Sequence, residues 1–86
     1  MTPEKRERIR DGLREHYRGM EQVIERTKTL KKGGYSPRYI KYVLDGKRKN
    51  LDILIVAGEV LLELRSQKLR KEERVNAVVR QVESLA

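Results

Sequence analysis

The stretch from Gly34 to Asn50 constrains the fold more than any other part of the chain, because it marks both ends of one short helix. Ser36 is a favourable N-cap residue, and Pro37 follows at the first helical position, where its missing N–H is not needed. Gly46 can adopt the left-handed conformation that commonly closes a helix. The sequence therefore predicts a capped helix over residues 36–45.

This predicted helix has one apolar face and one basic, aromatic face. Ile40, Val43 and Leu44 recur at the i, i+3 and i+4 spacing that places apolar side chains on one side of a helix. A run of three basic residues follows the closing glycine. The residues that face outward are Arg38, Lys41 and Tyr42, with Tyr39 near the boundary between the faces.

The positive charge of the chain is concentrated in its first half. The formal net charge is +8, of which residues 1–34 contribute +4 and residues 35–50 another +4, whereas residues 51–86 are neutral. An uneven basic charge of this kind favours a polyanionic partner for the first half. A polyanionic partner does not explain the role of the neutral second half.

The pattern Gly-Tyr-Ser-x-x-Tyr-Ile-x-x-Val-Leu-x-Gly-Lys-Arg-Lys-Asn over residues 34–50 resembles the turn and recognition helix of phage-repressor-like helix-turn-helix proteins, of the lambda repressor and Cro type. The resemblance covers this stretch well and the flanking residues poorly. It implies a small regulator of bacterial or phage origin that binds double-stranded DNA and places residues 36–45 in the major groove.

The same resemblance implies which residues contact DNA. Arginine can pair bidentately with guanine, and tyrosine rings can contact thymine methyl groups or donate a hydroxyl to phosphate, whereas basic residues after the helix hold the backbone without reading sequence. The expected base-reading residues are Ser36, Arg38, Tyr39, Lys41 and Tyr42. The expected backbone contacts are Lys31, Lys32, Lys47, Arg48, Lys49 and Asn50.

Two further helices are predicted before this stretch. Thr2 and Pro3 can begin one over residues 3–18, and an apolar stripe from Ile9 continues through Leu13 and His16/Tyr17 to Met20. A second spans residues 20–30. The junction between this helix and the turn can be aligned with the helix-turn-helix pattern in two ways. One alignment has no gap. The other treats residues 28–33 as an insertion that lengthens the turn, and we prefer it because it keeps the apolar positions in place. The lysines of this insertion then either follow a phosphate backbone or form a solvated loop.

The C-terminal half is predicted to contain two amphipathic helices. Residues 51–65 carry apolar side chains on two faces, and residues 70–86 carry a stripe of valines. The stripe either folds back over the second face or meets another subunit. We expect a homodimer whose interface includes Ile55, Gly58, Leu62, Val78 and Val82.

Several classes of protein are not indicated. The chain has no Cys, which fits a reducing cytoplasm. We expect neither a signal peptide at residues 1–4 nor a membrane span, because no apolar run approaches the roughly 20 residues that a span needs. His16 is the only histidine, and no catalytic pairing, cofactor motif or metal-ligand cluster is recognisable, so we expect neither an enzyme nor a cofactor or metal site.

The sequence thus predicts one compact all-α domain of about five helices, with a basic helix-turn-helix region at 1–50 and a charge-neutral apolar region at 51–86 that completes the core and dimerises. Sequence-specific binding of double-stranded DNA is the expected function. Two alternatives remain open: a binder of RNA or single-stranded nucleic acid, and a protein-interaction or antitoxin-like module whose basic face meets an acidic protein.

Overall fold

One long helix, α4 (Leu51–Leu85), runs through the molecule, and three short helices cover its first half. They are α1 (Pro3–Arg14), α2 (Gly19–Thr27) and α3 (Pro37–Leu44) in the computed structural model, which describes residues 2–85. No strand occurs within that range, so the all-α prediction is confirmed.

The helix count differs from the prediction, with four helices in residues 2–85 in place of about five. The two helices predicted over residues 51–65 and 70–86 are one continuous helix as far as Leu85, and Ala86 lies outside the described residues. Ser66, Gln67, Lys68 and Leu69 join them, and none of these residue types breaks a helix.

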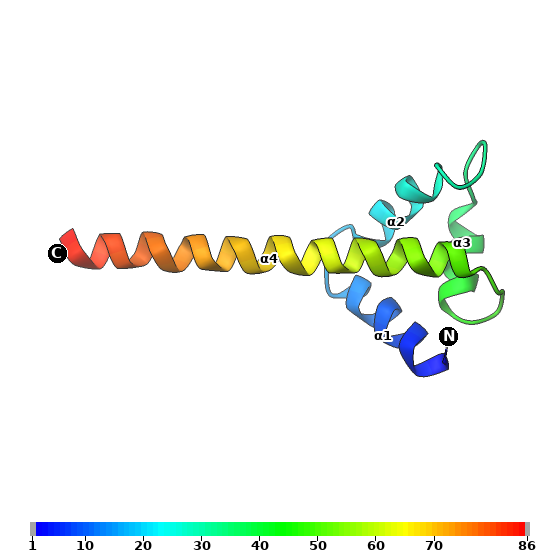
Figure 1. The fold of residues 1–86 in the computed structure, drawn as a ribbon, viewed down its shortest axis with the longest axis horizontal. Helices are drawn as coiled ribbons and strands as arrows, with labels where there is room; N and C mark the ends of the chain where they lie inside the picture. Colours follow the sequence, from blue (N-terminus) through cyan, green and yellow to red (C-terminus); the bar gives the residue numbers. More distant parts are fainter. Residues whose placement is uncertain (1, 86) are drawn as a thin grey trace.

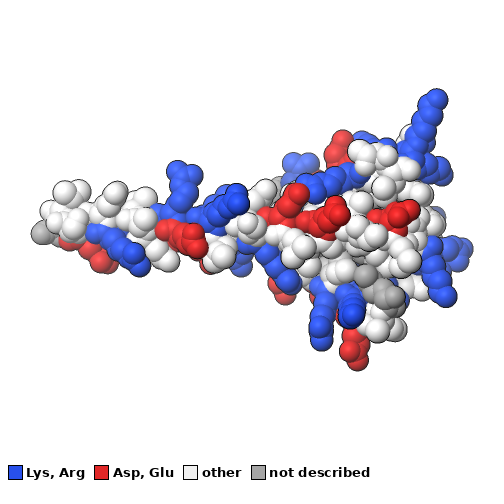
Figure 2. All heavy atoms as spheres, in the orientation of Figure 1, with Lys and Arg blue, Asp and Glu red and all other residues white. Residues whose placement is uncertain are grey.

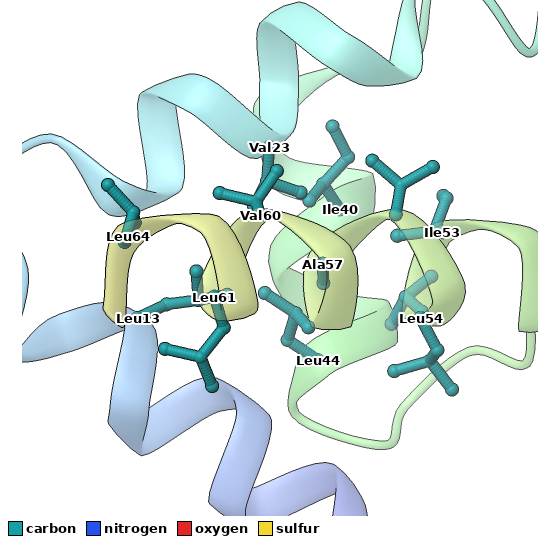
Figure 3. Close-up of a cluster of buried hydrophobic side chains, with 12 residues drawn as sticks. Leu13, Val23, Ile40, Leu44, Ile53, Leu54, Ala57, Val60, Leu61 and Leu64 are labelled. Carbon is teal, nitrogen blue, oxygen red and sulfur yellow. The ribbon is translucent and has the colours of Figure 1, made fainter. Parts of the chain in front are cut away.

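Helix α4 is the common packing partner of the other three helices. Figure 1 shows α1 and α2 on either side of the first half of α4, with α3 across its N-terminal end. Residues from all four helices meet in one hydrophobic core (Figure 3). Its buried members are Leu13, Val23, Ile40, Val43, Leu44, Ile53, Leu54, Val56, Ala57, Val60, Leu61 and Leu64.

Side-chain caps begin three of the four helices, and the sequence predicts those at Thr2 and Ser36. Thr2 Oγ1 accepts a hydrogen bond from the Lys5 amide (3.3 Å), and Ser36 Oγ accepts one from the Tyr39 amide (3.1 Å). Asn50 Oδ1 accepts one from the amide of Ile53 (3.2 Å). Such bonds satisfy amides that have no partner within the helix.

The corner between α1 and α2 lies earlier than predicted, because α1 ends at Arg14 and does not reach residue 18. The corner includes Arg18, which has a left-handed backbone (φ 59°), and Gly19, which begins α2. A Cβ added to Gly19 would lie 2.5 Å from the carbonyl oxygen of Leu13, so only glycine permits this close approach. Tyr17 is consequently 90% exposed and does not extend the apolar stripe of α1.

A nine-residue loop, residues 28–36, connects α2 to α3. Helix α2 ends at Thr27, so Leu30 lies in the loop and is partly exposed rather than on the apolar face of a helix reaching residue 30. Gly33 and Gly34 both have positive φ, the conformation that favours glycine. The loop is longer than the three to four residues usual between the two helices of a helix-turn-helix.

Ion pairs join the short helices to their neighbours. Arg26 of α2 forms a bidentate pair with Glu63 of α4, with Nη1 donating to Oε1 (2.9 Å) and Nη2 to Oε2. The hydrogen bond from Arg26 lowers the pKa of the Glu63 carboxyl below its ordinary value. Both side chains are substantially exposed, so this pair contributes little stability and serves mainly to orient α2.

The second half of α4 extends away from the other helices (Figure 1). Every residue from Arg65 to Leu85 is exposed, and this segment is called the tail below. Because the tail continues the same helix as residues 51–65, the alternative in which it folds back over them is wrong. Among the described helices, none combines the length and the apolar character that crossing a membrane requires.

Candidate nucleic-acid interface

Helix α3 is held with its apolar side inward and its polar side in solvent. Ile40, Val43 and Leu44 are fully buried, which confirms the predicted inner face. At the C-terminal end of α3, Gly46 has φ +86°. Its amide bonds the Val43 carbonyl (3.1 Å), and the Lys47 amide bonds the Tyr42 carbonyl (2.8 Å). This Schellman arrangement turns the chain sharply into the basic run.

The predicted base-reading residues occupy two different environments. Ser36, Arg38 and Lys41 are exposed on the outer side of α3. Tyr39 is only partly exposed and packs against the core, with its ring stacked on that of Tyr35 at 5.3 Å between centroids. Tyr39 therefore helps to fix α3 in place, whereas Ser36, Arg38 and Lys41 form the outer side of this helix.

Tyr42 is also half-buried, and its ring lies beneath a lysine. Lys47 Nζ is 5.4 Å from the ring centroid of Tyr42, and Lys31 Nζ is 5.3 Å from that of Tyr35. Cation–π contacts at exposed sites are worth about 0.5–1 kcal/mol each. They hold one lysine on each side of α3, so the loops before and after the helix present positive charge next to it.

The predicted backbone contacts are exposed, with one exception. Lys31 and Lys32 lie in the loop before α3, and Lys47, Arg48 and Lys49 lie in the loop after it. Asn50 is half-buried, and its side-chain oxygen is occupied in capping α4, so its first role is structural. The name α3 surface is used below for the five exposed basic residues of these two loops together with four residues of α3 and its cap: Lys31, Lys32, Lys47, Arg48, Lys49, Ser36, Arg38, Lys41 and Tyr42.

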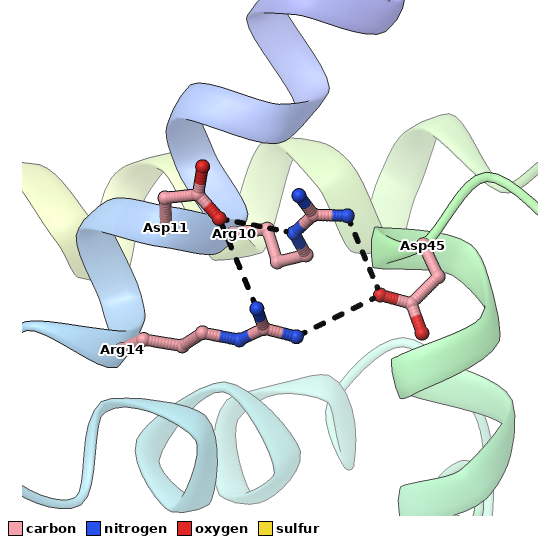
Figure 4. A network of polar contacts seen from close by, with 4 residues as sticks. All are labelled: Arg10, Asp11, Arg14 and Asp45. Atoms are coloured by element: carbon pink, nitrogen blue, oxygen red, sulfur yellow. Dashed lines mark hydrogen bonds and ion pairs between the residues drawn. The ribbon is translucent and has the colours of Figure 1, made fainter.

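The one acidic residue in this region is neutralised from α1. Residues 28–50 contain eight Lys or Arg and a single acid, Asp45. Figure 4 shows Asp45 between two arginines of α1, at 3.7 Å from Arg10 Nη1 and 4.0 Å from Arg14 Nη2. The hydrogen bond from Arg10 to Asp11 raises the pKa of Arg10, which stays charged. In Figure 2, basic side chains project from the end of the molecule that carries α3.

The sequence reasoning missed this network, although one signal for it was present. Asp45 follows the last residue of α3, where the negative end of the helix dipole disfavours an acid. An acid at this position is stabilised by a basic side chain from another helix. The i, i+4 spacing of Arg10 and Arg14 on α1 offers two.

The predicted dimer residues do not form one surface. Ile55 and Leu62 are more than half exposed on α4, whereas Gly58 faces α1, where an added Cβ would lie 3.7 Å from Ile9 Cδ1. At 3.6 residues per turn, Val78 and Val82 point about 160° away from Leu62. The expected interface therefore consists of two separate faces of α4.

Within residues 2–85, no group of three His, Cys, Asp or Glu side chains is placed to hold a metal ion. In comparisons with known proteins, no family model matches the chain, and no curated protein or solved structure is significantly similar to it.

Proposed function

We propose that the protein binds double-stranded DNA through the α3 surface and acts as a small, sequence-specific transcriptional regulator. The observation that carries this proposal is the charge of residues 28–50, which contain eight basic residues and one acid whose charge is already paired with α1. A surface of this kind attracts the phosphates of a nucleic acid.

The dimensions of α3 support entry into the major groove. An α-helix with its side chains is about 10–12 Å in diameter, and the major groove of B-DNA is about 12 Å wide. Arg38 and Lys41 project from the outer side, where they can reach base edges. Helix α2, the nine-residue loop and α3 then act as a helix-turn-helix whose turn is lengthened by residues 28–33.

The tyrosines favour a duplex over a single strand as the ligand. Binding of unpaired bases relies on free aromatic faces. The rings of Tyr35 and Tyr39 stack on each other and are half-buried, and the Tyr42 ring lies under Lys47. The aromatic groups near α3 are thus engaged within the protein, while the cations around them are free to meet phosphates.

We also propose that the protein is a homodimer that pairs through the tail. Val75, Val78, Val82 and Leu85 follow the alternating three- and four-residue spacing of coiled-coil a and d positions, with β-branched valine at both a positions. All four are more than half exposed. The tail buries none of its residues against the other helices, and a second copy supplies the identical stripe that a symmetric pair requires.

Salt dependence tests the proposed function directly. Each phosphate contact adds about 0.9 to the negative slope of log K against log salt on a duplex. Replacing Lys47, Arg48 and Lys49 together by Ala is expected to flatten that slope by about two to three in fluorescence-anisotropy titrations. A parallel titration with single-stranded DNA is expected to show weaker binding. An unchanged slope, or equal affinity for both ligands, would contradict the proposed interface.

Arg38→Ala tests whether α3 reads bases. If Arg38 pairs with a guanine, the variant weakens the preferred site by about 1–3 kcal/mol and relaxes discrimination at one base pair. Binding to unrelated duplexes is expected to stay nearly unchanged. The measurement is competition binding on a set of single-base variants of the preferred site. Equal losses on specific and unrelated DNA would make Arg38 a phosphate contact instead.

Val82→Glu tests the tail as the dimer interface, with Leu62→Glu as the matched control on the opposite face. Burying an unpaired charge is strongly unfavourable, so Val82→Glu is expected to give a monomer in sedimentation velocity. The monomer should keep its helical content by circular dichroism, because Val82 lies outside the core. Leu62→Glu should remain a dimer. A wild-type monomer at tens of micromolar, or dissociation by Leu62→Glu alone, would refute this interface.

A further inference from the structure

A hollow at the junction of α1 with the α3–α4 loop gathers three basic side chains. It has a volume of about 390 Å³, and its polar lining includes Arg6, Arg48, Lys49 and Asn50 over an apolar floor that includes Val43 and Leu54. Figure 1 shows the start of α1 beside the α3–α4 loop, which is how Arg6 comes next to residues more than forty positions later. No acidic residue lines the hollow.

Arg6 is held in this hollow by its contact with Gly46. A Cβ added to Gly46 would lie 2.5 Å from both Cζ and Nη2 of Arg6, so the guanidinium lies directly against the glycine backbone. Gly46 is favoured by its positive φ at the end of α3, and its lack of a Cβ also leaves room for the Arg6 guanidinium. A guanidinium confined in this way loses less side-chain entropy when it binds a ligand.

The contact with Gly46 leaves the charge of Arg6 without a polar partner. Its Nε is buried without a hydrogen-bond partner, and no ion pair of Arg6 occurs among residues 2–85. The carbonyls of Tyr42 and Val43 at the end of α3 already accept backbone hydrogen bonds. No side-chain hydrogen bond joins Arg6 to α3 among residues 2–85, so Arg6 does not cap this helix, and its charge lies beside two other cations without compensation.

We infer that Arg6, Arg48 and Lys49 form a binding site for one phosphodiester group of the DNA backbone. An anion in the hollow relieves the repulsion among the three cations, and arginine binds phosphate oxygens with two parallel hydrogen bonds. The inference rests on the proposed function and extends it, because it adds a contact from α1 that fixes how the whole molecule is oriented on the duplex. Arg6 is a positioning residue here, since a phosphate contact carries no sequence information.

The test compares Arg6→Gln with Arg8→Gln, which removes the same charge from the same helix. Arg8 is exposed and lines a different groove, beside Leu62 and Arg65 of α4. In anisotropy titrations, Arg6→Gln is expected to reduce the salt slope by about 0.9, which at 0.15 M salt is an affinity loss of roughly fivefold. The loss should be the same on specific and unrelated duplexes. Arg8→Gln should match the wild type.

Further measurements make each outcome decisive. Arg6→Lys keeps the charge and loses the two-pronged geometry, so it should retain the slope and lose affinity. Thermal melts by circular dichroism establish that the variants are folded. Equal slopes for Arg6→Gln and the wild type, or equal losses for Arg6→Gln and Arg8→Gln, would overturn the site while leaving DNA binding intact. A wild type that binds inorganic phosphate but no duplex would refute the proposed function and assign the hollow to a small anion.

Discussion

Burial of one face of α4 between Ile53 and Leu64 holds the rest of the structure in place. The three other helices have 12, 9 and 8 residues, lengths at which isolated helices are marginal or unstable in water. They persist because each buries its apolar side against this part of α4, where Ala57 and Val60 are fully buried. The direction in which α3 presents Arg38 and Lys41 is therefore set by α4 rather than by α3 itself.

Apolar burial stabilises the fold, whereas the charges around α3 repel one another because most of them are positive. The molecule pairs the one acid of this region with Arg10 and Arg14, so that α1 is attached to the end of α3 while the α3 surface stays positive. Arg6 then adds a further cation beside Arg48 and Lys49. An arrangement that brings cations together without acids is unfavourable in the free protein, and an anionic ligand relieves it.

Local signals were enough to predict the ends of α3 but not the corner before it. Ser36, Pro37 and Gly46 act through atoms a few residues away, so their effect is visible in the sequence. The corner at residues 15–18 depends on the contact of Gly19 with the Leu13 carbonyl, which requires knowledge of how α1 and α2 cross. The sequence likewise explained Gly46 by its backbone conformation and missed its contact with Arg6, because that contact joins distant segments.

The continuity of α4 was hidden by the change of its apolar pattern. The face that begins at Ile53 is covered by the short helices as far as Leu64, then carries Lys68 and Lys71, and resumes as valines from Val75. An apolar pattern interrupted in this way predicts two helices with a linker, although no helix-breaking residue lies between the two apolar segments. The structure assigns the first part to the core and leaves the second part available to another molecule.

The most direct test of DNA binding through the α3 surface is a titration of the ¹⁵N-labelled protein with a duplex, followed by NMR. We expect the amide resonances of residues 36–49 and the side-chain resonance of Arg6 to shift most, and those of residues 66–85 to remain in place. The largest shifts in the basic residues of the tail, with α3 unchanged, would contradict DNA binding through the α3 surface.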